Sequence, residues 1–430
     1  MPPVTLAVVG AGNRGNGHGD WALANPDRAR VVAVAEPRDV RRGRFAARHG
    51  IPAGATFAGW RELADRGRLA DAVLICTQDV LHAEPAIAFA ELGYHVLLEK
   101  PMATTETDCR RIVETVERAD VVFAVCHVLR YTPYTALVKR VVDAGRLGEV
   151  VSVQHLEPVG FLHHAHSYVR GAWRNQGTST FMLLAKSCHD LDWLQYVVGR
   201  PIRRVASFGG LTHFTPEHRP AGAADRCLDC AVEPTCPYSA VRFYSGCLER
   251  GAGWPLDAVM DGSTEAELLA ALRQGPYGRC VYAGDNDVVD HQVVAMEFDG
   301  GPTGAFVMTA FNAGGHRRTR LFGTRGELEG DGEAVRVYDF LTGTAEVLSA
   351  RPPGDATAGG GHGGGDWGLM DAFVSALATG DRSRVLTGPR ESLAAHLVVF
   401  AAERARHEGM VATVPTDAQR GDDVGGLRPP

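Results

Sequence analysis

The sequence predicts an α/β protein with two domains: an N-terminal doubly wound parallel sheet, then an α+β domain with a mixed, mainly antiparallel open sheet. Two observations support this prediction. Over residues 1–128, short apolar runs rich in β-branched side chains alternate with segments of helical periodicity. Over residues 129–414, several strand-like segments follow one another, which favours antiparallel or mixed pairing.

Five apolar runs in the first domain are predicted as buried strands, because Gly, Pro or charged residues bound each of them. They are 4–9, 31–35, 72–76, 95–98 and 121–125. Helical patterns at 40–49, 84–92 and 106–119 lie between them, and this alternation places helices on both faces of a parallel sheet. Pro101 stops the fourth strand, so the chain is expected to leave the sheet sharply at Glu99-Lys100-Pro101.

The second domain is predicted to combine a few helices with the strands of its sheet. Helices are expected at 137–144, 183–198, 367–378 and 390–407, and strands at 149–156, 203–208, 292–298, 304–311 and 319–322. A cysteine-containing segment at about 211–290 separates two strands and is interpreted as an insertion. The glycine run 359–365 is expected to be a loop, and the polar residues 415–430 a flexible tail.

The composition excludes several classes of protein. A chain of 430 residues is long enough for two or three domains, and with 45% hydrophobic and 22% charged residues it is not expected to be disordered. A net charge of −7 argues against a general nucleic-acid binder. Apolar runs stay short of the ~18 residues that span a bilayer, and the chain starts on a strand without a basic leader. We expect a cytoplasmic protein that binds neither membrane nor nucleic acid. Nine cysteines, mostly single, do not suggest a disulfide framework.

A glycine-rich motif follows the first strand and predicts a dinucleotide site. Residues 10–15 read G-x-G-x-x-G, whose glycines allow a tight turn, close approach of pyrophosphate, and helix–strand packing. Glu36 ends the second strand, where a carboxylate can accept hydrogen bonds from the ribose hydroxyls of NAD. Arg38 is close enough that NADP stays an alternative cofactor. The alternative is a glycine turn in an unrelated doubly wound sheet. The predicted cofactor residues in this Rossmann domain are Gly10, Gly12, Asn13, Arg14, Gly15, Glu36 and Arg38.

Further motifs resemble one enzyme family. Cys76-Thr77, His82 and Glu99-Lys100-Pro101, within residues 73–105, are similar to the Gfo/Idh/MocA family, the glucose–fructose oxidoreductase and inositol dehydrogenase group. Arg130-Tyr131 with Pro133 resembles the start of the family's second domain, and Cys188-His189-Asp190-Leu191-Asp192 resembles its H-x-x-D helix. The stretch 361–366 is similar to a glycine/histidine loop of some branches.

The resemblance implies a nicotinamide enzyme that acts on a sugar or cyclitol. The sheet of the second domain would form the substrate wall and an oligomer interface, giving a homodimer or homotetramer. The resemblance adds Thr77, His82, Glu99 and Lys100 to the expected cofactor residues.

Hydride transfer from a carbinol requires a base for the hydroxyl proton and a donor to the reacting oxygen. Lys100 and His189 are the candidates, with Asp192 one helical turn later orienting His189 or capping a neighbouring element. The alternatives are a surface lysine after a proline-stopped strand and a core histidine. Many family members carry an aspartate four residues before this histidine; here the position is Ala185. Lys186, about 100° away around the helix, is a further candidate catalytic group or a solvated lysine.

A polar cluster precedes this helix and is predicted to bind a polyhydroxylated or acidic ligand. It consists of His163, His164, His166, Tyr168, Arg170 and Arg174. The alternatives are a metal site or a polar loop facing solvent. The predicted substrate-binding residues are Lys100, Arg130, Tyr131, His163, His166, Tyr168, Arg170, Arg174, Lys186, His189, Asp192 and His362.

Cysteines in the insertion are compatible with a structural zinc site. Cys227-x-x-Cys230 has knuckle spacing, and Cys236 and Cys247 complete four thiolates, with His213 or His218 as substitutes for Cys247. An iron–sulfur centre and free reduced thiols are the alternatives.

Three functions are open at this point. The first is an NAD-dependent oxidoreductase of a pyranoside or cyclitol. The second is a redox-neutral NAD-dependent glycosidase that oxidises C3, eliminates the C1 substituent, adds water and reduces the ketone again. The third is a non-catalytic NAD-binding sensor.

Overall fold

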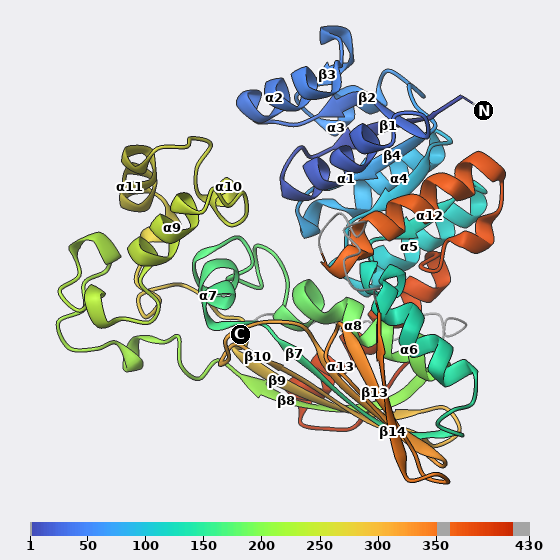
Figure 1. Cartoon of the computed structure of the whole chain (residues 1–430). Helices are drawn as coiled ribbons and strands as arrows, with labels where there is room; N and C mark the ends of the chain where they lie inside the picture. The colour runs from blue at the N-terminus through green and yellow to red at the C-terminus, as the bar shows by residue number, and fades with distance from the viewer. Residues whose placement is uncertain (1, 351–361, 416–430) are drawn as a thin grey trace.

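The computed structural model describes residues 2–350 and 362–415. Figure 1 shows two lobes, one around each sheet, and an arm that projects beside them and carries the helices α9 to α11. The chain passes from the first lobe to the second after residue 131 and returns to the first lobe with helix α12 (Gly365–Thr379).

The first sheet is parallel and six-stranded, in the order β3-β2-β1-β4-β5-β6. Its strands are β1 (Val4–Val9), β2 (Ala29–Ala35), β3 (Thr56–Phe57), β4 (Ala72–Ile75), β5 (His95–Leu98) and β6 (Phe123–Val125). Helices α1 (Asn13–Ala24), α2 (Asp39–His49), α3 (Trp60–Ala64), α4 (Ala83–Glu91) and α5 (Glu106–Arg118) connect them. The strand order reverses between β1 and β4, which is where doubly wound sheets bind ligands. The predicted doubly wound parallel sheet is confirmed.

The second sheet has nine strands in the order β14-β13-β12-β11-β7-β10-β9-β8-β15. They are β7 (Val150–Pro158), β8 (Ile202–Gly210), β9 (His291–Phe298), β10 (Thr303–Thr309), β11 (Arg318–Gly323), β12 (Gly326–Gly330), β13 (Ala334–Asp339), β14 (Thr344–Ser349) and β15 (Ala412–Thr413). Only the β7–β10 pair is parallel among these neighbours, which confirms the predicted mixed, mainly antiparallel sheet.

Helices cover one face of the second sheet and leave the other face open. Helices α8 (Met182–Val198) and α13 (Pro389–Glu408) pack on the inward side chains of β8 to β10, next to α6 (Pro133–Asp143). Helix α13 also contacts α5, so it joins the two lobes. Helix α12 instead packs on the first sheet, where Leu369 and Phe373 share a core with Leu6 and Val8.

The insertion between β8 and β9 is a folded arm with its own core. It contains α9 (Ala240–Glu249), α10 (Leu256–Val259) and α11 (Glu265–Gln274), none of which the sequence analysis predicted. Tyr244, Leu268 and Leu272 are fully buried within it. A reciprocal pair of hydrogen bonds between Thr264 and Glu267 caps α11, which explains where that helix begins.

Two predicted segments lie mostly outside the described residues. Of the expected loop 359–365, residues 362–364 form a 3₁₀ turn and Gly365 begins α12; the remainder is not described. The expected tail 415–430 is described only at Pro415. None of the helices in the described ranges combines the length and apolar character needed to cross a bilayer.

A buried ion pair anchors helix α8 to the turn that links the lobes. Arg130 binds both carboxylate oxygens of Asp192 at 2.7 Å, and both side chains are less than a tenth exposed. Arg130 also donates to the carbonyl of Leu386 at 2.7 Å. Removing one partner would leave a desolvated charge without compensation.

We therefore expect Asp192→Ala to lower the free energy of unfolding by about 3–5 kcal/mol, measured as a shift of the urea midpoint. Asp143→Ala is the matched control, since Asp143 pairs with Lys139 at an exposed i,i+4 position. The control should cost only about 0.3–0.5 kcal/mol. Equal losses in the two variants would contradict the assignment.

Candidate active site

The glycine loop after β1 has the geometry of a phosphate cradle. Gly10 has φ 94°, and a Cβ there would lie 2.5 Å from the carbonyl oxygen of Cys76. A Cβ on Gly15 would lie 2.0 Å from the carbonyl of Gly10, so helix and loop touch at this point. Gly12 instead borders open space, since the nearest atom to a Cβ would be Arg41 Nη1 at 4.0 Å. The loop is therefore packed behind and open in front, at the N-terminus of α1.

Glu36 lies against this loop, as the motif spacing predicted. Its carboxylate is buried and accepts from the amides of Ala11 at 2.8 Å and Arg38 at 3.0 Å. Helix α1 has no acidic residue in its first turn and no side-chain cap, so its amides are available to an anion. These residues fit a dinucleotide, and the buried carboxylate would repel a 2′-phosphate, which favours NAD over NADP.

Arg14 and Glu99 pair with each other beneath the loop. Arg14 Nε lies 2.6 Å from Glu99, His18 Nε2 lies 2.9 Å from it, and a second Arg14 nitrogen binds Asp366 at 2.8 Å. Burial raises the pKa of Glu99, but Arg14 and His18 outweigh it and hold that pKa well below its usual range. Asp366 in turn binds His362 at 3.1 Å, which brings the start of α12 to the first domain.

His82 and Thr77 lie beside the end of β5. Both ring nitrogens of His82 contact backbone carbonyls, of Pro101 at 2.7 Å and of Thr77 at 3.2 Å. His82 thus holds the β4 loop against the Lys100–Pro101 turn.

Lys100 crosses from the end of β5 to helix α8. Its ammonium donates to the carbonyl of Ala185, one turn before His189. His189 is buried; its Nε2 lies 2.8 Å from Arg317, and its Nδ1 has no hydrogen-bond partner among the described residues. Burial lowers the pKa of His189 well below its usual value, and Arg317 and Lys100 lower it further against the opposing charge of Asp190. The imidazole is therefore neutral, and because Arg317 donates to Nε2, its proton is on Nδ1, which is a donor.

Two residues that the sequence analysis missed complete this charge network. Glu157, near the end of β7, binds Lys186 at 3.1 Å and Arg317 at 3.0 Å. Arg317, just before β11, also pairs with the buried Asp190. Glu157 has the inward parity of β7, which was a usable signal, whereas Arg317 stands in a basic run that resembles solvated surface. Lys186 is thus a paired, mostly buried cation.

Arg130, Tyr131 and Asp192, expected at the substrate, are engaged by the protein itself. Asp192 binds Arg130 as described, and not His189. The Tyr131 hydroxyl lies 3.0 Å from that of Thr387 and accepts from the amide of Leu386 at 2.8 Å.

The polar cluster at 163–170 forms a buried strap rather than a solvent-facing loop. It is made of α7 (Phe161–His164) and one π-helical turn, Ala165–Arg170. Burial lowers the pKa of His163 well below its usual value, with Lys186 adding to the effect, so His163 is neutral. His166 and Arg170 face the insertion: His166 Nδ1 lies 2.7 Å from the hydroxyl of Tyr244.

Tyr168 and Asp79 are two further buried groups near the crevice. Burial raises the pKa of Tyr168 well above its usual value, and the charge of Asp79 adds to this. Asp79, which sequence reasoning missed, accepts from Trp173 Nε1 at 2.8 Å; burial raises its pKa, while His82 and Lys100 oppose the rise. Arg174 lies outside this group, paired with Asp285 at 2.8 Å.

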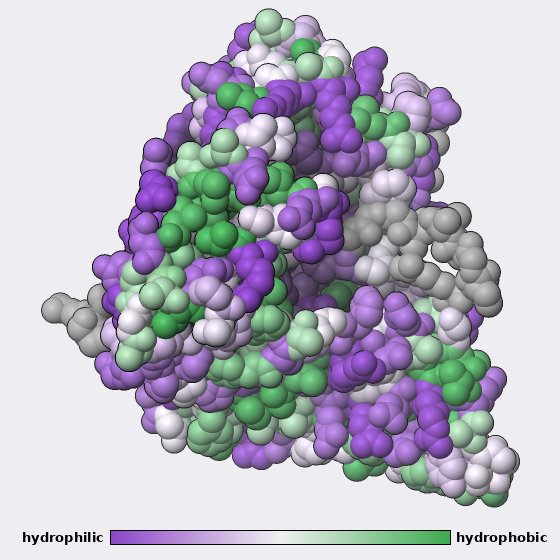
Figure 2. Space-filling view, turned by 60° about the vertical axis from the view of Figure 1, so that its left-hand side comes forward, coloured by the Kyte–Doolittle hydropathy of each residue, from purple (hydrophilic) through white to green (hydrophobic). Residues whose placement is uncertain are grey.

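The arm reaches both parts of this site. Asn13, at the glycine loop, donates to Asp257 of α10 at 3.2 Å, and Arg41 pairs with Asp261 at 3.0 Å. Trp254 packs its ring 5.0 Å from that of His163. Figure 2 shows a hydrophilic hollow at the centre of this side of the molecule, between the lobes.

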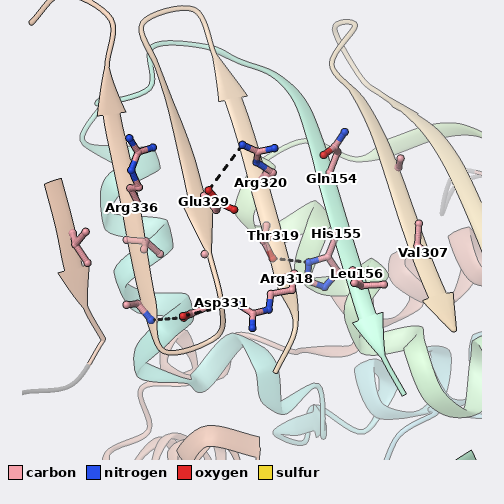
Figure 3. Close-up of a pocket in the computed structure, with 15 residues that line it drawn as sticks. Gln154, His155, Leu156, Val307, Arg318, Thr319, Arg320, Glu329, Asp331 and Arg336 are labelled. Atoms are coloured by element: carbon pink, nitrogen blue, oxygen red, sulfur yellow. Dashed lines mark hydrogen bonds and ion pairs between the residues drawn. The ribbon is translucent and has the colours of Figure 1, made fainter. Parts of the chain in front are cut away.

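A separate hollow lies on the open face of the second sheet. Gln154, Leu156 and Val307 line it together with Arg318, Arg320, Glu329 and Arg336 on β11 to β13 (Figure 3). None of the candidate cofactor or catalytic residues lines it, so it is not part of the crevice.

Comparison with known proteins now identifies the family. Residues 4–127 match the family model described as "Oxidoreductase family, NAD-binding Rossmann fold", and residues 139–414 match its "C-terminal alpha/beta domain". This chain belongs to the Gfo/Idh/MocA family. It is accordingly an NAD-binding oxidoreductase, and the predicted family and enzyme class are confirmed.

Three curated relatives are similar to this chain over part of its length. The oxidoreductase YteT of Bacillus subtilis (strain 168) is 26% identical over 69% of this chain and 70% of its own. The 2,7-anhydro-N-acetylneuraminate hydratase of Escherichia coli (strain K12) is 29% identical over 35% of this chain and 39% of its own. The scyllo-inositol 2-dehydrogenase (NAD(+)) of Bacillus subtilis (strain 168) is 27% identical over 52% and 62%. Two of these alignments therefore span less than two thirds of the relative.

The fold also matches solved structures. A levoglucosan dehydrogenase in complex with NADH and L-sorbose superposes with a TM-score of 0.71 at 18% identity, covering 97% of this chain and 100% of that chain. At this identity the match shows the shared fold.

Gly10 provides a test of the cradle. We expect Gly10→Ala to weaken NADH binding, measured by fluorescence titration, because the positive φ costs about 1–3 kcal/mol and the new Cβ meets a backbone carbonyl. Gly17→Ala is the matched control, since nothing lies within 4 Å of a Cβ there. The control should bind NADH as the wild type does. Unchanged affinity in Gly10→Ala would refute the geometry.

Proposed function

We propose that this enzyme oxidises a secondary hydroxyl of a pyranoside or cyclitol, with NAD as cofactor. The observation that carries the proposal is the proximity of two groups: Lys100 binds the carbonyl of Ala185, and the neutral, half-partnered His189 follows one turn later on α8 and feels the charge of Lys100. The dinucleotide, when bound, accepts the hydride from the carbinol carbon. The scyllo-inositol dehydrogenase among the relatives supports this substrate class.

The residues of the crevice divide the remaining work. Arg317 can only donate to His189 Nε2, so the neutral ring carries its proton on Nδ1, and this N–H donates a hydrogen bond to the reacting oxygen. Lys100, as a neutral amine, can keep its hydrogen bond to the Ala185 carbonyl and accept the hydroxyl proton on its lone pair. Lys186 and Arg317 add positive charge that Glu157 and Asp190 compensate. His163 and Tyr168 are positioned to contact other substrate hydroxyls.

A redox-neutral NAD-dependent glycosidase is the second candidate. Elimination after C3 oxidation needs a base for the C2 proton besides the group that handles the C3 oxygen. His163 supplies a second neutral imidazole on the strap, and the hydratase among the relatives favours chemistry beyond net oxidation. A non-catalytic NAD-binding sensor is the third candidate, and the presence of both Lys100 and His189 counts against it.

One assay separates these functions. The holoenzyme is incubated with cyclitols, free pyranoses and aryl glycosides, while absorbance at 340 nm and aglycone release are followed together. NADH accumulation without aglycone supports the dehydrogenase. Aglycone release with catalytic NAD and no NADH supports the glycosidase, and cofactor binding without turnover supports the sensor.

Lys100→Ala should lower kcat by about 10²–10⁴, the usual loss for an acid/base or charge-stabilising group. NADH affinity should stay unchanged, because the glycine loop and Glu36 do not contact this side chain. Lys139→Ala is the control, because Lys139 lies on α6 and pairs with the exposed Asp143. Full turnover in Lys100→Ala would remove Lys100 from the mechanism.

We also propose that the open sheet face forms the interface of a homodimer or homotetramer. Phe208, Val293, Val307 and Leu156 follow one another in register across four neighbouring strands, and Phe208 is 70% exposed. Such a band on an open sheet face favours a protein partner, and a second copy presents the same band.

Light scattering should give a dimer or tetramer for the wild type, and Phe208→Asp should lower the molar mass at equal concentration. Phe340→Asp is the control, because Phe340 is also exposed (53%) but lies at the β13–β14 turn. A monomeric wild type would contradict the proposed interface.

A further inference from the structure

Four cysteines of the arm surround one small cavity. Cys227, Cys230, Cys236 and Cys280 line a cavity of about 20 Å³, enough for one small ion or water. Its other walls include the apolar side chains of Val232 and Val281. Cys280 is far from the other three in sequence, but its amide donates to the carbonyl of Asp225 at 2.8 Å, next to an isolated bridge between Arg226 and Arg279.

Cys247, the fourth ligand expected from the sequence, does not line this cavity. It lies on α9 and packs in the arm's core with Tyr244, Leu268 and Leu272. Its sulfur accepts from Arg250 Nη2 at 3.5 Å, and Cys247 is absent from the walls of the cavity. The structure therefore exchanges Cys247 for Cys280 in the set of four.

A buried cation lies against the cavity without a carboxylate partner. Arg170 is 2% exposed; it donates to the carbonyls of Arg279 at 2.7 Å and Tyr238 at 2.8 Å, and its third contact is Cys227 Sγ at 3.6 Å. Within the described ranges no carboxylate forms an ion pair with it. A buried guanidinium is costly unless an anion compensates it, and neutral thiols do not. Four thiolates around a divalent cation carry a net charge of −2 and would supply that anion.

We propose that Cys227, Cys230, Cys236 and Cys280 bind one Zn²⁺ ion in a closed four-thiolate site. Soft thiolates in a Cys-x-x-Cys knuckle with two further cysteines are a typical structural zinc set. Among the described residues, only His18, Glu99 and Cys126 bring three candidate ligand atoms within 4.8 Å of one another, so the four sulfurs line the cavity without yet closing on its centre. Rotation of the side chains into the cavity would bring them to the metal.

The site would hold three separate stretches of chain together. The metal would bind two of them directly, the turn region Cys227–Cys236 and the segment at Cys280. The third is the end of the π-helical turn, which is held through the contact of Arg170 with Cys227. That turn belongs to the strap that carries His163 and Tyr168 to the crevice. The metal is thus a structural staple for the substrate side of the site, not part of the reaction.

The test is metal analysis of the purified full-length protein. We expect about one zinc per chain by mass spectrometry in the wild type and in Cys247→Ser, and a large loss of zinc in Cys280→Ser and Cys227→Ser. NADH titration of each variant confirms that the first domain is folded. Zinc that is lost in Cys247→Ser and kept in Cys280→Ser would overturn the ligand set.

A second measurement needs no variant. Titration of the native wild type with an organomercurial thiol reagent should release zinc to a chromophoric chelator in step with modification of four thiols. A wild type without zinc after growth in zinc-supplemented medium, or one that contains iron and sulfide, would overturn the proposal. Neither result touches the proposed oxidoreductase function, which the turnover assay tests separately.

Discussion

The contact between the Lys100 ammonium and the carbonyl of Ala185 determines how the two lobes form one site. Lys100 stands at the carboxyl end of β5, and Ala185 lies in the first turns of α8, so the bond fixes the end of one sheet to a helix covering the other. His189 follows one turn later on the same face and is thereby brought to Lys100. A methyl group at position 185 leaves the carbonyl accessible, whereas a carboxylate there would compete for the ammonium.

The second constraint is charge compensation in a buried space. Lys100, Lys186 and Arg317 lie close together where burial penalises every unpaired charge. Glu157 forms ion pairs with Lys186 and Arg317, and Asp190 forms one with Arg317. The chain has only three lysines among its 44 basic residues, and two of them stand here. Arginine provides bidentate structural pairs elsewhere, as at Arg130–Asp192, while lysine offers a compact charge that the substrate oxygen can approach.

Sequence reasoning was strongest where a local pattern carries the information. β1 is bounded as the apolar run predicted, and α8 and α13 agree to within a residue or two at their ends. No local pattern predicts the Glu157–Arg317 ion pair, because the pairing of β11 with β7 is what brings the two residues together. Strands β12 to β14 went unpredicted: charged outward residues such as Glu329 and Arg336 obscure their alternation. A solvent-facing loop stayed open as an alternative for the strap, because its burial depends on contacts with the arm, such as that of His166 with Tyr244.

The arm explains why an excursion as long as 211–290 is tolerated between two paired strands. β8 and β9 are antiparallel neighbours, so the ends of the insertion are already held together and its length adds little closure entropy. Its own core then offsets the cost of ordering it. Once folded, it contacts the glycine loop through Asp257 and the strap through Trp254. Because the arm contacts both the glycine loop and the strap, a displacement of the arm would change both at once.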